Sequence, residues 1–207
     1  MKGYIFDLDG VLVDTAKYHY IAWKTIAKEF NFELTPQHNE QLKGIGREVS
    51  LHQILQWAGK TLSETDFTDT ALRKNKLYLE QISSIDSSEL LPGVLNFLQL
   101  LKAHHKKIAL GSASRNARLV LERTGILPLF DAIVDGTMVS KAKPDPEVFL
   151  KATEGLGLPP ADCCVFEDAP AGVQAAKSAG MKVIGVGNPE VLKAADTVIP
   201  NFLNMKI

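Results

Sequence analysis

The sequence has few cysteines and no excess of charge of either sign. Its two cysteines, Cys163 and Cys164, are adjacent, so they cannot supply a disulfide framework or the spacing of a metal site. With 23 basic and 24 acidic side chains, the formal net charge is −1. A balanced charge removes any chain-wide electrostatic reason to bind nucleic acid or an anionic membrane. These absences exclude both as expected partners.

Long apolar runs are also missing. No stretch has the length and hydropathy of a membrane span, and the first residues lack the pattern of an export signal. Together with the scarcity of cysteine, this predicts a cytoplasmic protein. We expect it to be a monomer.

Six short runs rich in Val, Ile and Ala are typical of buried parallel strands, at 3–8, 107–113, 131–135, 163–168, 182–187 and 196–200. Helical patterns at 94–105, 115–125, 145–157 and 170–180 alternate with them. Such alternation predicts an α/β protein, with a Rossmann-like parallel sheet as its core.

One region interrupts the alternation. Between residues 15 and 87 the pattern predicts four helices, at 16–30, 35–44, 47–59 and 63–82, and no strand. We therefore predict a core domain from residues 1–14 and 88–207, with residues 15–87 inserted as a helical cap.

Carboxylates follow the predicted strands. Asp7 and Asp9 end the first run, Glu167 and Asp168 end another, Ser112 ends the second, and Lys143 lies in a loop beyond the third. Ligands of open α/β sheets bind outside the carboxyl ends of the strands, so these side chains should meet there. Four carboxylates in one crevice need a cation, and hard oxygen ligands favour Mg²⁺. One of them could then attack a phosphoryl group while another handles a proton. A turn at Gly10 suggests that the chain leaves strand geometry at about Leu8.

Four segments occur in the order of a known family's motifs: DLDGVLVDT, GSASRN, KPDPEVF and FEDAPAGVQAAKSAGM. They resemble the motifs of the haloacid dehalogenase superfamily of phosphotransferases, and they cover the whole chain. The helical insert resembles the cap of the β-phosphoglucomutase group within it. That group interconverts β-glucose 1-phosphate and glucose 6-phosphate through β-glucose 1,6-bisphosphate and a phosphorylated aspartate.

The resemblance implies specific roles for these residues. Asp7 would be the nucleophile, Asp9 the general acid and base, and Ser112 and Lys143 the ligands of the transferring phosphoryl group. Asp7, the Asp9 carbonyl and Asp168 would hold Mg²⁺, with Glu167 beside it. A further set of residues would bind the small phosphorylated sugar or take part in the hinge and closure of the cap. These residues are Thr15, His19, Trp23, Lys43, Gly44, Ile45, Arg47, Ser50, Lys74, Ala113, Ser114, Arg115 and Asn116. Arg115 stands where the best-known members have lysine, and Ile45 where they have valine.

Other interpretations are open for several positions. Asp7 and Asp9 alone would suit a solvated turn, and Glu167 with Asp168 would suit a helix start. His19 on spacing alone is a packing histidine, Arg47 a solvated side chain, and Lys141 a competitor of Lys143. The alternative functions are a sugar-phosphate or phosphoglycolate phosphatase that uses the same aspartates, and a phospho-aspartate receiver without turnover.

Overall fold

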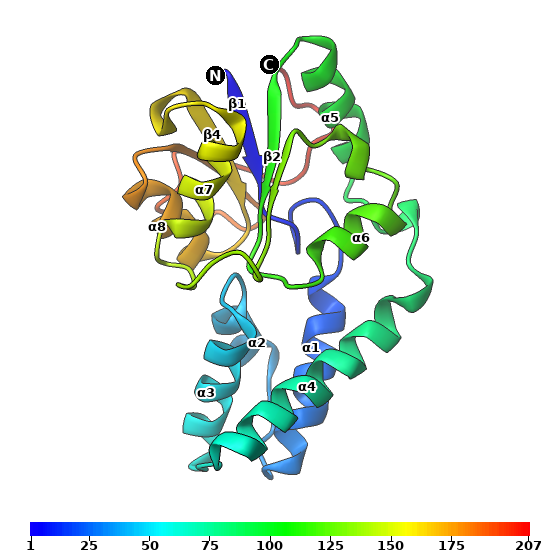
Figure 1. The fold of residues 1–207 in the computed structure, drawn as a ribbon, viewed down its shortest axis with the longest axis vertical. Helices are drawn as coiled ribbons and strands as arrows, with labels where there is room; N and C mark the ends of the chain where they lie inside the picture. Colours follow the sequence, from blue (N-terminus) through cyan, green and yellow to red (C-terminus); the bar gives the residue numbers. More distant parts are fainter.

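Six parallel strands form one sheet in the order β3-β2-β1-β4-β5-β6, in a computed structural model that describes residues 1–207. The strands are β1 (Gly3–Phe6), β2 (Lys107–Gly111), β3 (Ala132–Val134), β4 (Cys163–Glu167), β5 (Lys182–Val186) and β6 (Thr197–Ile199). All six predicted strands are confirmed, each one or two residues shorter than its apolar run. The first strand of the chain lies at the centre, with β2 and β4 beside it (Figure 1).

Alternate residues of the central strands point to opposite faces of the sheet, as strand geometry requires. Tyr4 and Phe6 of β1 belong to the apolar cluster that includes Phe97, whereas Ile5 packs with Phe149 on the other face. Helices α5 (Val94–Ala103) and α6 (Ala117–Arg123) supply the first cluster, and α7 (Glu147–Leu156) and α8 (Pro170–Ser178) supply the second. The sheet is therefore buried on both sides, which explains its apolar sequence.

Two core helices begin later than predicted. Helix α6 starts at Ala117 because the preceding loop is held by hydroxyl groups: the Ser114 amide donates to Ser112 Oγ and the Asn116 amide to Ser114 Oγ. Helix α7 starts at Glu147, whose amide donates to Asp145 Oδ1. Such local side-chain bonds compete with helix formation. They leave residues 112–116 as an ordered loop.

The four helices of the predicted insert are confirmed. They are α1 (Ala16–Glu29), α2 (Pro36–Leu42), α3 (Arg47–Ala58) and α4 (Glu64–Gln81). Their apolar faces form a separate cluster around Trp23, Ile26, Leu51 and Ile54. Short 3₁₀ turns complete the chain: η1 (Ile82–Ser84), η2 (Ser87–Glu89), η3 (Leu127–Leu129) and η4 (Pro160–Asp162).

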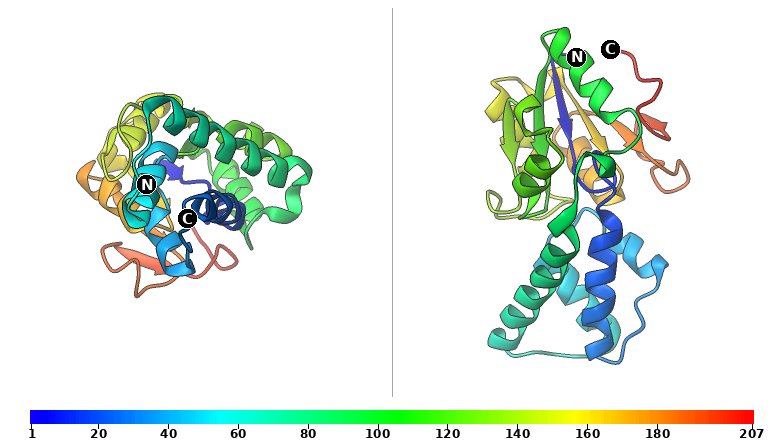
Figure 2. Two further views of the ribbon diagram at one scale, coloured as in Figure 1. Left: turned by 90° about the horizontal axis from the view of Figure 1, so that it is seen from below. Right: turned by 90° about the vertical axis from the view of Figure 1, so that its right-hand side faces the viewer.

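The helical part lies beyond the carboxyl ends of the strands, and both chain termini lie at the opposite end of the molecule (Figures 1 and 2). The two connections run side by side: the Asp14 amide donates to the Glu89 carbonyl at 2.9 Å, and the Leu91 amide to the Leu12 carbonyl at 3.0 Å. The predicted domain limits fall at these connections, and the division into domains stays a prediction. No helix has both the length and the hydropathy that a membrane span requires.

Candidate active site

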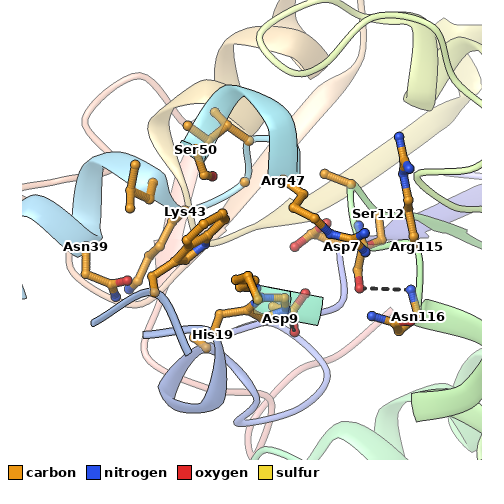
Figure 3. Close-up of a pocket in the computed structure, with 18 of the residues that line it drawn as sticks. Asp7, Asp9, His19, Asn39, Lys43, Arg47, Ser50, Ser112, Arg115 and Asn116 are labelled. Atoms are coloured by element: carbon orange, nitrogen blue, oxygen red, sulfur yellow. Dashed lines mark hydrogen bonds and ion pairs between the residues drawn. The ribbon is translucent and has the colours of Figure 1, made fainter. Parts of the chain in front are cut away.

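A pocket opens between the carboxyl edge of the sheet and the helical part, and it collects most of the predicted site residues (Figure 3). Those that line it are Asp7, Asp9, His19, Trp23, Lys43, Gly44, Ile45, Arg47, Ser50, Lys74, Ser112, Ala113, Ser114, Arg115 and Asn116. The other four, Thr15, Lys143, Glu167 and Asp168, lie behind the lining and contact it. Segments from both parts of the chain thus form a single site.

The chain leaves the sheet at the position that the sequence predicts. The Asp7 amide still pairs with the Phe166 carbonyl of β4, at 3.0 Å, but the Leu8 carbonyl accepts from the Leu12 amide at 2.9 Å. A tight turn therefore begins at Leu8. As a result, the carboxylates of Asp7 and Asp9 point to different partners, although the residues are only two apart.

Asp7 belongs to a buried acidic cluster with Glu167 and Asp168, in which one carboxylate oxygen of each residue lies within 4.8 Å of the others. Lys143 Nζ donates to Asp7 Oδ1 at 2.8 Å and to Glu167 Oε1 at 2.7 Å. Glu167 Oε2 accepts from the Ala169 amide at 2.8 Å. Both oxygens of Glu167 are thus engaged, and Glu167 holds the Lys143 ammonium next to Asp7.

The protonation of this cluster is strongly perturbed. Burial raises the pKa of Asp7 to about 7, against the opposing charge of Lys143, and Glu167 and Asp9 add to the increase. Burial also raises the pKa of Asp168 well above its ordinary value, and the charges of Glu167 and Asp7 act in the same direction. Carboxylates that repel each other in a buried site favour a bound cation. Their hard oxygen atoms fit Mg²⁺, and Asp7 and Asp168 are the residues of the cluster whose side chains could hold it.

The Asp9 side chain lies outside that cluster and faces the helical part. Its Oδ1 accepts a hydrogen bond from Thr15 Oγ1, and His19 Nε2 lies 3.6 Å away. Burial raises the pKa of Asp9, but His19, Thr15 and Lys74 outweigh it and hold this pKa below its ordinary value. Because the Asp9 carboxylate is not part of the acidic cluster, Asp9 could contribute to a metal site there through its backbone carbonyl, which is the role that the family resemblance implies.

His19 is part of a buried network rather than a simple packing residue. Its ring stacks on Tyr78 at 3.9 Å between centroids, and Lys74 Nζ lies 2.6 Å from its Nδ1. Burial and Lys74 lower the pKa of His19, and burial and Arg47 lower the pKa of Lys74 to about 7. Lys74 also lies 4.8 Å above the ring of Trp23. The network links α1 and α4 to Asp9.

Positive and amide side chains gather at the end of the pocket formed by the 112–116 loop, on the right of Figure 3. Arg47, at the start of α3, lines this end beside Arg115 and Asn116. Burial and the neighbouring Arg115 lower the pKa of Arg47. Arg115 Nη2 forms an ion pair with Glu48 at 3.0 Å, which joins the core loop to α3. This end of the pocket is suited to an anion.

The helical part formed by residues 15–87 covers the pocket and is called the lid from here on. Its loop between α2 and α3 lies directly on the core, so the lid is closed. Lys43 Nζ lies 3.7 Å from Asp168 Oδ2 and 3.0 Å from Glu40 Oε1. Gly44 has a φ of +72°, and a Cβ there would come within 2.9 Å of the Ala169 Cβ. Only glycine suits this combination of backbone and close approach.

Two polar residues of the pocket were not predicted, Asn39 and Asn75; the apolar Ala16 and Leu42 complete its lining. Both asparagines stand in the helical insert, and the resemblance of that insert to a known cap was the available signal. Lys141 is excluded as the alternative to Lys143, because its Nζ pairs with Asp145 at 3.6 Å on an exposed loop. Ser50 lines the pocket, with its hydroxyl donating to the Gly46 carbonyl.

A parallel α/β sheet that presents a buried acidic cluster and a lysine beneath an inserted group of helices is the architecture of a capped α/β enzyme. The chain belongs to the haloacid dehalogenase-like hydrolase family, whose model matches residues 4–186. It is therefore an enzyme of that superfamily, as the motifs predicted.

Individual relatives are similar over nearly the whole chain. β-Phosphoglucomutase of Bacillus subtilis (strain 168) is 47% identical over 201 residues, which is 96% of this chain and 89% of that protein. A crystal structure of β-phosphoglucomutase from Clostridium difficile matches with a TM-score of 0.96 and 42% identity, covering 100% of this chain and 94% of that one. Fructose-1-phosphate phosphatase YqaB of Escherichia coli (strain K12) is 31% identical over 89% of this chain and 95% of its own length.

Proposed function

We propose that this chain is a β-phosphoglucomutase, which interconverts β-D-glucose 1-phosphate and glucose 6-phosphate through an aspartyl-phosphate and β-glucose 1,6-bisphosphate. The observation that carries the proposal is that one pocket is lined at one place by Asp7, beside the acidic cluster and Lys143, and also by the basic and amide side chains of Arg47, Arg115 and Asn116. A transferring phosphoryl group would lie at Asp7, with its charge offset by Lys143 and a bound cation, and a second phosphate would lie at Arg47. A bisphosphate needs both sites, and similarity to the Bacillus and Clostridium proteins supports this substrate class.

In this mechanism the Asp7 carboxylate attacks the phosphoryl group, and Lys143 and Ser112 bind the oxygen atoms whose charge changes during transfer. Mg²⁺ bound by Asp7, Asp168 and the Asp9 carbonyl would neutralise part of the phosphate's charge. Asp9 takes the proton from the sugar hydroxyl that attacks the aspartyl-phosphate, and returns one to the leaving hydroxyl. Its contacts with Thr15 and His19 hold it toward the substrate side of the pocket.

The lid decides between sugar and water as the phosphoryl acceptor. Closure of the 43–47 loop on the core removes the site from solvent, and the second phosphate held by Arg47 contributes binding energy to that closure. A phosphatase with the same aspartates would release phosphate to water instead. The two functions therefore share Asp7 and differ in the fate of its phosphoryl group.

The decisive experiment measures both fates on the same protein. β-Glucose 1-phosphate is supplied with Mg²⁺ and β-glucose 1,6-bisphosphate, and formation of glucose 6-phosphate is followed by a coupled assay beside release of free phosphate. We expect glucose 6-phosphate to dominate. Predominant phosphate release would assign the chain to the phosphatases.

Two aspartate variants separate the roles within the pair. Asp7→Asn should abolish both activities, because the amide cannot form the phosphoenzyme. Asp9→Asn should reduce transfer to the sugar by at least about a hundredfold, since it removes acid–base catalysis. Asp14→Asn is the matched control, because Asp14 is the next aspartate along the chain and is exposed at the junction. Turnover by Asp7→Asn near that of the wild type would refute the covalent mechanism.

A further inference from the structure

Asn75 lies on α4 at the boundary between the lid and the core, where its side chain has two partners. Arg47 Nη2 and Asn116 Nδ2 each donate a hydrogen bond of 2.8 Å to the same oxygen, Asn75 Oδ1. Arg47 belongs to helix α3 of the lid, whereas Asn116 follows β2 in the core. One carboxamide oxygen thus joins three segments that are far apart in the sequence.

These two bonds constrain groups that have little else to hold them. Asn75 is the only residue to which the Arg47 guanidinium is hydrogen-bonded in the structure, and it is the only hydrogen-bond partner of the side-chain carboxamide of Asn116. Both groups line the anion-binding end of the pocket. A long side chain such as arginine loses substantial rotamer entropy when it is fixed, so prior orientation improves binding.

The chemistry of the acceptor is also suited to this position. Arg47, Arg115 and Lys74 place three basic groups near one another, and Glu48 pairs with Arg115 only. A carboxylate at position 75 would neutralise the Arg47 guanidinium and repel a phosphate. The neutral amide oxygen of Asn75 orients the guanidinium and leaves its charge available to the ligand.

We propose that Asn75 is a positioning residue, which sets Arg47 and Asn116 for the non-transferring phosphate and couples occupancy of that site to closure of the lid. The proposal rests on the proposed function for the identity of the sugar phosphate. Asn75 does not take part in the chemistry at Asp7. Its loss should therefore affect reactions that use the second phosphate and spare those that do not.

The test compares Asn75→Ala with Lys76→Ala, the exposed neighbour on the same helix. In the mutase assay we expect Asn75→Ala to raise two quantities about tenfold: the KM for β-glucose 1-phosphate and the bisphosphate concentration that gives half-maximal activity. Loss of a hydrogen bond to a charged group predicts an effect of this size. Phosphate release from acetyl phosphate, which has a single phosphoryl group, should stay within about twofold. Unchanged KM values, or an equal loss with acetyl phosphate, would overturn the proposal.

A second measurement does not depend on turnover. Calorimetry measures glucose 6-phosphate binding to four proteins that all carry Asp7→Asn. One has no other change, two carry Asn75→Ala or Asn116→Ala, and the fourth carries both, which together make a double-mutant cycle. If Asn75 acts through Asn116 and Arg47, Asn75→Ala should weaken binding much less when Asn116 is already alanine. Additive losses would contradict this. If the wild type forms no glucose 6-phosphate, the proposed function fails, while the cycle still decides the role of Asn75.

Discussion

Asp7 and Asp9 show how two identical side chains, two residues apart, acquire different chemistry. Asp7 faces Glu167 and Asp168, so burial and like charges raise its pKa to about 7. Asp9 faces Thr15 and His19, and these partners hold its pKa below the ordinary value despite burial. The turn at Leu8 is what separates the two environments.

Lys74 gives a prediction at the same scale. Burial, with Arg47, lowers its pKa to about 7, whereas the unfolded chain keeps an ordinary lysine pKa near 10.5. Between these values the unfolded state binds more protons, so the free energy of unfolding should rise as the pH rises from 7 toward 10.5. Lys74→Met should remove up to about 1.4 kcal/mol of that increase per pH unit.

Urea unfolding from pH 7.5 to 9 checks this, because the raised pKa of Asp7 acts only at lower pH. Lys76→Met is the exposed control and should keep the slope of the wild type. If Lys74→Met keeps that slope as well, the lysine does not titrate in this range.

At the scale of elements, the loop from α2 to α3 acts as the contact surface of the lid. Gly44→Ala should push this loop off the core, since the added methyl group would meet Ala169, which is buried. We expect kcat/KM in the mutase assay to fall at least about tenfold, as small displacements of a catalytic arrangement do. Gly59→Ala is the matched control: its φ of +62° imposes a similar backbone strain, but a Cβ there meets nothing within 4 Å. An equal loss in both variants would attribute the effect to strain alone.

The elements themselves could largely be predicted from the sequence, because buried parallel strands require uninterrupted apolar runs and lid helices require periodic ones. Their ends could not. Helices α6 and α7 start where Ser112, Ser114 and Asp145 bind backbone amides, which depends on local geometry. Asn75 was missed for a different reason: its partners, Arg47 and Asn116, lie 28 and 41 residues away in the sequence, and only the fold brings the three together.

At the scale of the whole molecule, the lid has an apolar core of its own. Ile54→Ala in that core should lower the lid's free energy of unfolding by about 3 kcal/mol, from lost burial and a cavity. Both tryptophans, Trp23 and Trp57, lie in α1 and α3, so their fluorescence reports on the lid. In urea this signal should change before the part of the far-ultraviolet circular dichroism that comes from the helices and sheet of the core.

Ile108→Ala, a buried residue of β2, is the matched control and should instead shift the core's part of the circular dichroism transition to lower urea. Coincident shifts of both signals in both variants would mean that the molecule unfolds as one unit, contrary to the predicted division at residues 15–87.

The central place of β1 in the sheet has a consequence for biosynthesis. Of the six strands of the sheet, the strand that carries Asp7 is made before the others, and its neighbours begin only at Lys107 and Cys163. Residues 15–87 are translated in between, and they contain every helix that contributes to the lid's own apolar cluster. The strand of Asp7 therefore has no pairing partner while the lid is being made, and the edge of the sheet that lines the pocket can be assembled only after translation has passed β4.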